Sequence, residues 1–173
     1  EKGVKRDRRG AAQVRARLAD HEAGHFLASQ AIEGTTHIEV LKGDDFTEIR
    51  RYPLKPPSVS AVVDMQSSGI IAEMFLMDGC RDSVIRWARK YGLVRWAESF
   101  SPFAEYDLLS LKFFSHDEQI ASAVRVLNCF ISVDQIVKMG DVIQTHIDSL
   151  DVGESALVYR SPEFRHLSVA DLK

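Results

Sequence analysis

Residues 18–34 read LADHEAGHFLASQAIEG, and this stretch carries the strongest structural signal in the chain. Apolar and small residues recur around it at helical spacing, from position 11 to about position 32. Gly34 then supplies a residue that takes the left-handed conformation at little cost, as helix ends require. We therefore predict a helix over residues 11–32. His21 and His25 are four residues apart, so their imidazoles project from the same face of it.

The pattern His-Glu-x-x-His inside this helix predicts a metal site with hydrolytic chemistry. Two imidazoles on one helix face can coordinate a single Zn²⁺ at about 2.0–2.1 Å each. Water bound to such a metal becomes a nucleophile near neutral pH, and a neighbouring carboxylate can take its proton. The sequence thus predicts His21 and His25 as zinc ligands and Glu22 as the general base.

The third protein ligand remains open at this point. Catalytic zinc usually has three protein ligands and one water molecule. Ala31 occupies the position, six residues after His25, at which one class of zinc peptidases has a third histidine, so that class is excluded. Two carboxylates are candidates: Glu73, within GIIAE on a predicted later helix, and Asp107, within AEYDL.

Most of the remaining chain has helical periodicity, with one region of strand pattern. Residues 37–41 and 46–52 alternate in the manner of a hairpin around a Lys-Gly-Asp-Asp turn. We expect further helices over 58–78, 83–98 (interrupted at Gly92), 101–114, 115–131 and 132–150. Beyond Gly153 we expect irregular chain with a short last helix over 169–173. The predicted fold class is therefore α+β, mostly α with a small sheet.

Composition narrows the classes of function. The 173 residues favour one domain, which we place at 11–173, after a basic and frayed N-terminal segment over 1–10. A net charge of −3 gives no case for nucleic acid as a partner. No run of about 18 apolar residues predicts a transmembrane segment. The two cysteines, far apart in sequence, favour a reducing soluble compartment such as the cytoplasm.

In combination, these motifs resemble the peptidase domain of the FtsH-type, membrane-anchored AAA zinc metalloproteases. The resemblance covers residues 11–150 in order: His-Glu-Ala-Gly-His, a strand pair after that helix, the Gly-x-x-Ala-Glu motif at 69–73, and Asp107-Leu108. It implies that Asp107 is the third zinc ligand and that Glu73 lies close behind the ligands. The chain departs from the family in having no phosphate-binding loop of an ATPase and a longer segment over 78–106.

These observations predict a zinc metalloendopeptidase that acts on polypeptides, served by a separate unfoldase or adaptor because the ATPase motif is missing. An alternative interpretation, from a different class of function, is a non-catalytic regulator or adaptor that retains the peptidase fold. Glu22 argues against that alternative, since a protein without the chemistry has little need of the carboxylate. Zinc content discriminates between the two: one equivalent of zinc favours the peptidase, and a stable metal-free fold favours the adaptor.

Overall fold

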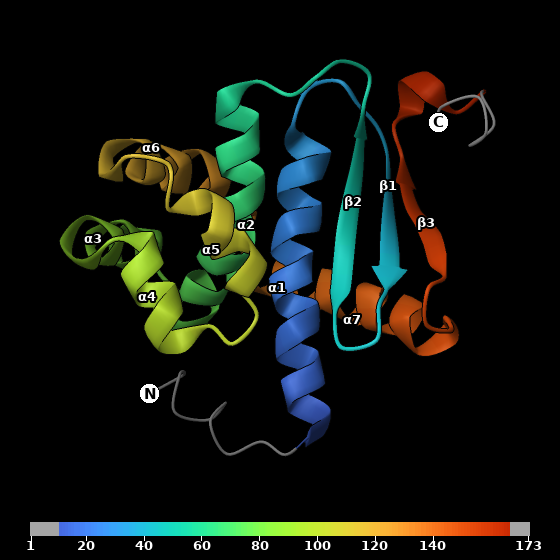
Figure 1. The fold of residues 1–173 in the computed structure, drawn as a ribbon, viewed down its shortest axis with the longest axis horizontal. Coiled ribbons are helices and arrows are strands. Elements are labelled where there is room, and N and C mark those ends of the chain that lie inside the picture. Colours follow the sequence, from blue (N-terminus) through green and yellow to red (C-terminus); the bar gives the residue numbers. More distant parts are fainter. Residues whose placement is uncertain (1–10, 167–173) are drawn as a thin grey trace.

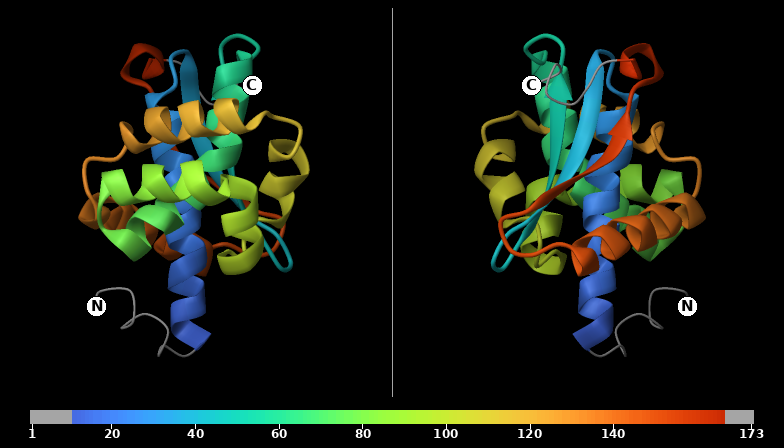
Figure 2. Two further views of the ribbon diagram at one scale, coloured as in Figure 1. Left: turned by 90° about the vertical axis from the view of Figure 1, so that its left-hand side faces the viewer. Right: turned by 90° about the vertical axis from the view of Figure 1, so that its right-hand side faces the viewer.

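Two long helices lie side by side at the centre of the computed structural model, which describes residues 11–166 (Figure 1). They are α1 (Ala11–Ala31) and α2 (Val59–Asp78). The sheet lies on the side of α1 away from α2, and α7 also packs on α1, while α6 packs on α2 (Figures 1 and 2). The predicted helix over 11–32, which carries the His-Glu-x-x-His pattern, is thereby confirmed as a central element.

The described residues form seven α-helices, three strands and one 3₁₀ turn, so the predicted α+β class is confirmed. After α1 come β1 (Thr35–Lys42), β2 (Thr47–Pro53) and α2, then α3 (Arg81–Tyr91), α4 (Leu93–Phe100), α5 (Glu105–Leu111), α6 (His116–Leu127), α7 (Val133–Ser149), β3 (Ser155–Arg160) and the 3₁₀ turn Pro162–Phe164.

The sheet is antiparallel with the order β2-β1-β3, so β1 has a partner on each side. Ile38 of β1 lies opposite Arg51 of β2 and opposite Tyr159 of β3, and Ile38 itself is fully buried. The hairpin of β1 and β2 confirms the prediction for residues 37–52. The expectation of irregular chain after Gly153 was wrong: a six-residue strand follows, because β1 offers it a paired edge that its own sequence does not reveal.

Helix starts followed their sequence signals closely. Ser58 and Ser132 cap α2 and α7 by accepting a hydrogen bond from the backbone three residues on, and Ser115 forms a full capping box with Glu118. The interruption expected at Gly92 is confirmed: this residue, at φ +80°, divides the helix over 83–98 into α3 and α4. One start differs from prediction, since the helix expected from Ser101 begins only at Glu105.

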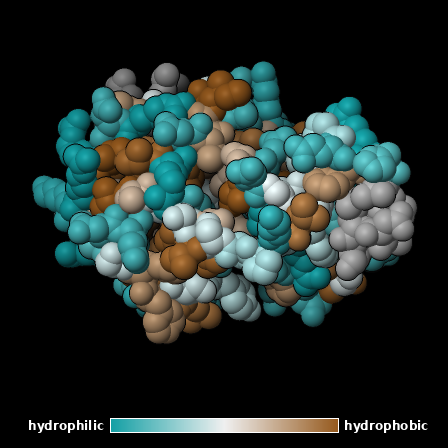
Figure 3. Space-filling model, turned by 90° about the horizontal axis from the view of Figure 1, so that it is seen from above, coloured by the Kyte–Doolittle hydropathy of each residue, from teal (hydrophilic) through white to brown (hydrophobic). Residues whose placement is uncertain are grey.

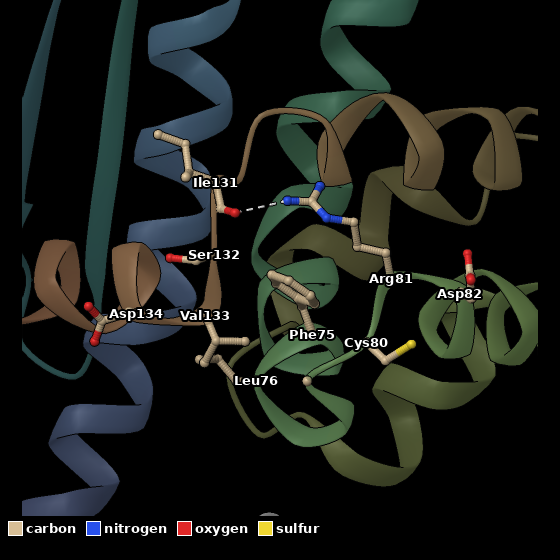
Figure 4. A pocket seen from close by; sticks show the side chains of 10 residues that line it. Phe75, Leu76, Cys80, Arg81, Asp82, Ile131, Ser132, Val133 and Asp134 are labelled. Carbon is tan, nitrogen blue, oxygen red and sulfur yellow. Dashed lines mark hydrogen bonds between the residues drawn. The ribbon is translucent and has the colours of Figure 1, made fainter.

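The helix expected over 115–131 ends at Leu127, and Arg81 binds carbonyl groups at its end and in the turn that follows. The guanidinium donates hydrogen bonds to the carbonyls of Leu127 and Phe130, and to that of Ile131 (Figure 4). Arg81 also lies over the ring of Phe75, 5.4 Å from its centroid. A charged side chain thus ends one helix and joins it to α2.

Helix α2 is the one helix within residues 11–166 that is long and apolar enough to cross a membrane, and two thirds of that stretch (67%) is buried in the fold. Apolar residues on the face shown in Figure 3 lie in patches separated by hydrophilic ones. The structure therefore fits the expectation that this part of the chain contains no transmembrane segment. The predicted segment over 1–10 and helix over 169–173 lie outside the described residues.

Candidate metal centre

Three helices bring the five predicted site residues together. His21, Glu22 and His25 come from α1, Glu73 from α2 and Asp107 from the first turn of α5. The Nε2 atoms of His21 and His25 are 3.1 Å apart, and Asp107 Oδ2 lies 3.0 Å from the first and 3.2 Å from the second. These three atoms form a nearly equilateral triangle. Glu73 lies on the other side of His21, with Oε2 3.2 Å from Nδ1.

The hydrogen bonds of the two Nδ1 atoms decide which atoms of the triangle carry protons. His25 Nδ1 is 2.7 Å from the carbonyl oxygen of Met65, which can only accept, so this nitrogen donates. His21 Nδ1 faces the carboxylate of Glu73 and donates to it in the same way. A neutral imidazole carries one proton, so both Nε2 atoms then present a lone pair to the triangle.

Two nitrogen lone pairs and a carboxylate oxygen within 3.2 Å of one another repel unless positive charge lies between them. Either a cation or added protons can supply that charge. Ligands of tetrahedral zinc, at bond lengths of 2.0–2.1 Å, are about 3.3 Å apart, close to the spacing of the triangle. The donor set of two imidazole nitrogens and one carboxylate oxygen also suits this metal. The residues therefore fit a zinc ion that leaves a fourth position open.

The pKa values of the three residues of the triangle show the same preference for positive charge when protons, and not a cation, supply it. Burial lowers the pKa of His21, but the hydrogen bonds to Asp107 and Glu73 outweigh it and raise that pKa to about 10. Burial also lowers the pKa of His25, and the charge of Asp107 outweighs it. In the case of Asp107, burial raises the pKa, while the two histidines pull it well below its usual range. The centre is thus built to hold positive charge.

Glu22 is buried beside the triangle without being part of it. Its carboxylate and the imidazole nitrogens lie within 4.8 Å of one another, a looser arrangement than the 3.0 and 3.2 Å that join Asp107 to the histidines. We therefore assign the third coordinating position of the candidate centre to Asp107 rather than to Glu22. Burial raises the pKa of Glu22 to about 7, an effect that the two histidines partly offset. A carboxyl group with this pKa can exchange a proton near neutral pH.

The close approach of α1 to α2 depends on two glycines. A Cβ atom at Gly69 would lie 2.5 Å from His21 Nε2 and 2.7 Å from His25 Nε2. A Cβ atom at Gly24 would lie 2.5 Å from the carbonyl oxygen of Ser68. Only glycine at these two positions therefore allows α1 and its imidazoles to approach α2 this closely.

Sequence reasoning missed the groups that hold His25. The Met65 carbonyl and the hydroxyl of Ser68, at 3.0 Å, both bind its Nδ1 atom, and Phe103 lies beside His21 with ring centroids 6.1 Å apart. The run Ser67-Ser68-Gly69 was a signal for close backbone approach, but it could not indicate which side chains would use the space. Every residue has a backbone carbonyl group, so the sequence does not indicate which one will bind a histidine.

Two features near the centre depend on the packing of distant elements. Asp20 of α1 is buried against α7, and a Cβ atom at Gly140 would lie 2.5 Å from its Oδ1 atom. Strand β1 is paired along both edges and so has no edge free for an extended peptide. Within residues 11–166 the strands with an unpaired outer edge are β2 and β3, because the order of strands places both at the outside of the sheet.

A pocket also lies away from this centre, between the end of α2, the start of α3 and the turn into α7 (Figure 4). It is lined by Phe75, Cys80, Arg81 and Val133 among others. The guanidinium of Arg81 is already engaged with backbone carbonyls, and no histidine lines the pocket to serve as a base for Cys80.

No family model matches the chain, and neither a curated protein nor a solved structure matches it. The candidate metal centre and the sequence motifs that form it are therefore the features that indicate a function for this chain.

Proposed function

We propose that this protein is a zinc-dependent peptidase whose metal is held by His21, His25 and Asp107. The observation that carries the proposal is the triangle of three electron-pair donors within 3.2 Å of one another, with each histidine bound at Nδ1 so that Nε2 points inward. Zinc, when bound there, supplies a Lewis acid and lowers the pKa of a coordinated water. Glu73 orients His21, as carboxylates behind metal-binding histidines commonly do.

Glu22 performs the proton transfers in this proposal. Its carboxylate takes a proton from the attacking water and delivers it to the nitrogen of the leaving amine as the peptide bond breaks. Its burial favours this role, because a carboxyl group with a pKa near 7 both accepts and releases a proton readily. Glu73 takes no part in proton transfer in this proposal, because its carboxylate binds Nδ1 of His21, on the far side of that ring from the triangle.

Strand β2 is the element best placed to bind an extended polypeptide substrate. Its outer edge is open within the described residues, so a substrate can pair with it as a further strand. Glu48 of β2 is close enough to Glu22 to raise the pKa of that carboxyl group. Phe46, just before the strand, lies 6.5 Å from Tyr106 between ring centroids, and Tyr106 is the neighbour of Asp107. These contacts place β2 and α5 beside the same centre.

We also infer that the chain is related to the FtsH-type peptidases, as its motifs suggest. The contact of Asp107 with both histidines and the position of Glu73 behind His21 support this relationship, because they are the roles that the resemblance assigns to these residues. Polypeptides would then reach the site unfolded, or through a separate unfoldase or adaptor. Two free cysteines, Cys80 and Cys129, agree with the proposed reducing compartment.

The test is a comparison of wild type with Glu22→Gln, using zinc content and cleavage of an unfolded polypeptide. We expect one zinc per chain in both proteins, and a loss of activity of about 10²–10⁴-fold in the variant, as removal of a general base produces. Glu98→Gln is the matched control, because Glu98 is exposed and contacts only Lys112 on the surface. Full activity in Glu22→Gln would refute the mechanism. A stable wild-type protein that takes up no zinc would favour the regulator or adaptor.

A further inference from the structure

Helices α3 and α4 supply no residue to the candidate metal centre, yet their outer face has a distinct chemistry. Its exposed residues include Arg86, Trp87, Arg89, Lys90 and Tyr91 of α3 and Arg95 of α4. We call these six residues the α3–α4 basic face. In the left view of Figure 2, α3 crosses the side of the molecule that is turned toward the reader. The chain as a whole has a net charge of −3, so this face is a local departure from its average.

The cations of the α3–α4 basic face have no acidic partners within the described part of the protein. Within residues 11–166, none of Arg86, Arg89, Lys90 and Arg95 forms an ion pair with a carboxylate. Other cations do have such roles: Lys42 binds the last carbonyls of α7, and Arg125 pairs with Asp64 at 2.9 Å. Of the exposed acids of α3 and α4, Glu98 pairs with Lys112, and Asp82 in the first turn of α3 is outnumbered by the four cations. The face therefore presents positive charge that is available to a partner.

The aromatic residues of this face are arranged for burial in an interface rather than for stacking on bases. Trp87 is 41% exposed and Tyr91 is 37% exposed. Their ring centroids are 4.9 Å apart, and Lys90 Nζ lies 5.1 Å from the centroid of Tyr91. The ring faces that a nucleobase would need are thus partly covered by neighbours. Trp and Tyr beside Lys and Arg are instead typical of surfaces that lie in the headgroup region of a bilayer.

We propose that the α3–α4 basic face docks the protein on an anionic lipid bilayer. Charge complementarity identifies the bilayer as the partner. The four cations without a carboxylate partner contact the phosphates of the headgroups, while Trp87 and Tyr91 enter the interface. Helix α3 has the required amphipathic form: Val84 and Ala88 are fully buried against the protein, so the helix keeps its own core contacts while its outer side faces the lipid. This docking is independent of the proposed peptidase activity.

The size of the effect can be estimated from the charges. Each Lys or Arg near an anionic membrane surface strengthens binding by about five-fold. Replacement of Arg86, Arg89 and Lys90 by glutamine should therefore weaken binding to anionic vesicles by about 100-fold. The attraction is screened by salt, so binding should also weaken as the ionic strength rises.

The experiment is co-sedimentation of the full chain with vesicles of phosphatidylcholine containing phosphatidylglycerol, and with vesicles of phosphatidylcholine alone. We expect binding to the anionic vesicles only, and its loss in the triple variant Arg86→Gln, Arg89→Gln, Lys90→Gln. The matched control removes three exposed cations from other faces, Lys55→Gln, Lys138→Gln and Arg165→Gln, and changes the net charge equally. The control should bind as the wild type does.

Fluorescence supplies a second readout that identifies the docking face. Trp87 is exposed and Trp96 is buried, with 6% exposure, so brominated lipids should quench the wild type and not Trp87→Phe. The proposal is overturned if the wild type does not bind anionic vesicles, if the triple variant and the control bind equally, or if quenching persists in Trp87→Phe. Tight binding to a single-stranded oligonucleotide without binding to vesicles would also overturn it and would identify a nucleic-acid surface instead.

Discussion

Gly69→Ala should abolish metal binding while leaving the protein folded. The added Cβ atom would lie 2.5 Å from His21 Nε2 and 2.7 Å from His25 Nε2, whereas ordinary contacts of this kind measure 3.4–4 Å. Both rings would have to move by about 0.7 Å or more, and metal sites tolerate errors of only about 0.2 Å in their bond lengths. The bonds of each Nδ1 atom to Glu73 and to the Met65 carbonyl oppose that movement.

The cost to the fold should be much smaller than the cost to the site. Extra volume in a packed region costs about 1–3 kcal/mol, and replacing glycine inside a helix recovers about 0.5–1 kcal/mol. We therefore expect the free energy of unfolding of the metal-free protein to fall by at most about 2.5 kcal/mol. Zinc affinity should fall by at least about 100-fold, since two ligands are displaced together.

The assay pairs zinc titration against a competing chelator with urea unfolding of the metal-free protein. Gln66→Ala, on the same helix, removes a side chain that forms no hydrogen bond to either histidine within residues 11–166, and this variant should bind zinc as the wild type does. Gly24→Ala should instead lower the stability of the fold more than Gly69→Ala does. Its Cβ atom would lie 2.5 Å from the carbonyl oxygen of Ser68, so it would push α1 away from α2. Wild-type zinc affinity in Gly69→Ala would refute the placement of the two imidazoles against α2.

Three further outcomes follow from the structure. Asp107→Asn should lose zinc almost completely in a chelator titration, whereas Glu73→Gln, which acts only through His21, should weaken zinc binding by about 10–100-fold; equal losses would contradict the assignment of Asp107 as the ligand. The metal-free protein should become less stable to urea as the pH rises from 6.5 toward 10. The pKa of His21 is raised from 6.5 to about 10, so the protonated form, which stabilises the fold, is lost over that interval. A urea midpoint that does not change between pH 6 and pH 9 would contradict this prediction. Iodoacetamide at neutral pH should label Cys80 before Cys129, because backbone and side-chain hydrogen bonds from Ser83 lower the pKa of the first thiol and burial raises that of the second; mass spectrometry of the labelled peptides decides the order.

Local sequence was sufficient wherever the physical cause was local. The spacing of His21 and His25 placed both imidazoles on one side of α1, and the serines at 58, 115 and 132 marked helix starts because their hydroxyl groups bind the backbone three residues on. The turn after Lys42 likewise predicted the hairpin. These features depend on backbone geometry within a few residues, which the order of residues determines by itself.

Tertiary structure decided everything that depends on distant partners. Strand β3 forms because β1 offers it an edge, and the same pairing leaves β1 without a free edge. Arg81, 46 residues away in the sequence, binds the carbonyl of Leu127 at the end of α6. Neither effect has a signature in the segment that it changes.

The choice between Asp107 and Glu73 shows the same division most clearly. Both are carboxylates on later helices, and spacing alone left them as alternatives for the third coordinating position. The fold brings Asp107 Oδ2 within 3.2 Å of both Nε2 atoms and puts Glu73 behind Nδ1 of His21. The sequence by itself determined that two imidazoles would share a helix face. Only the packing of α1 against α2 and α5 decided which carboxylate faces their lone pairs, because that depends on the direction from which each helix arrives.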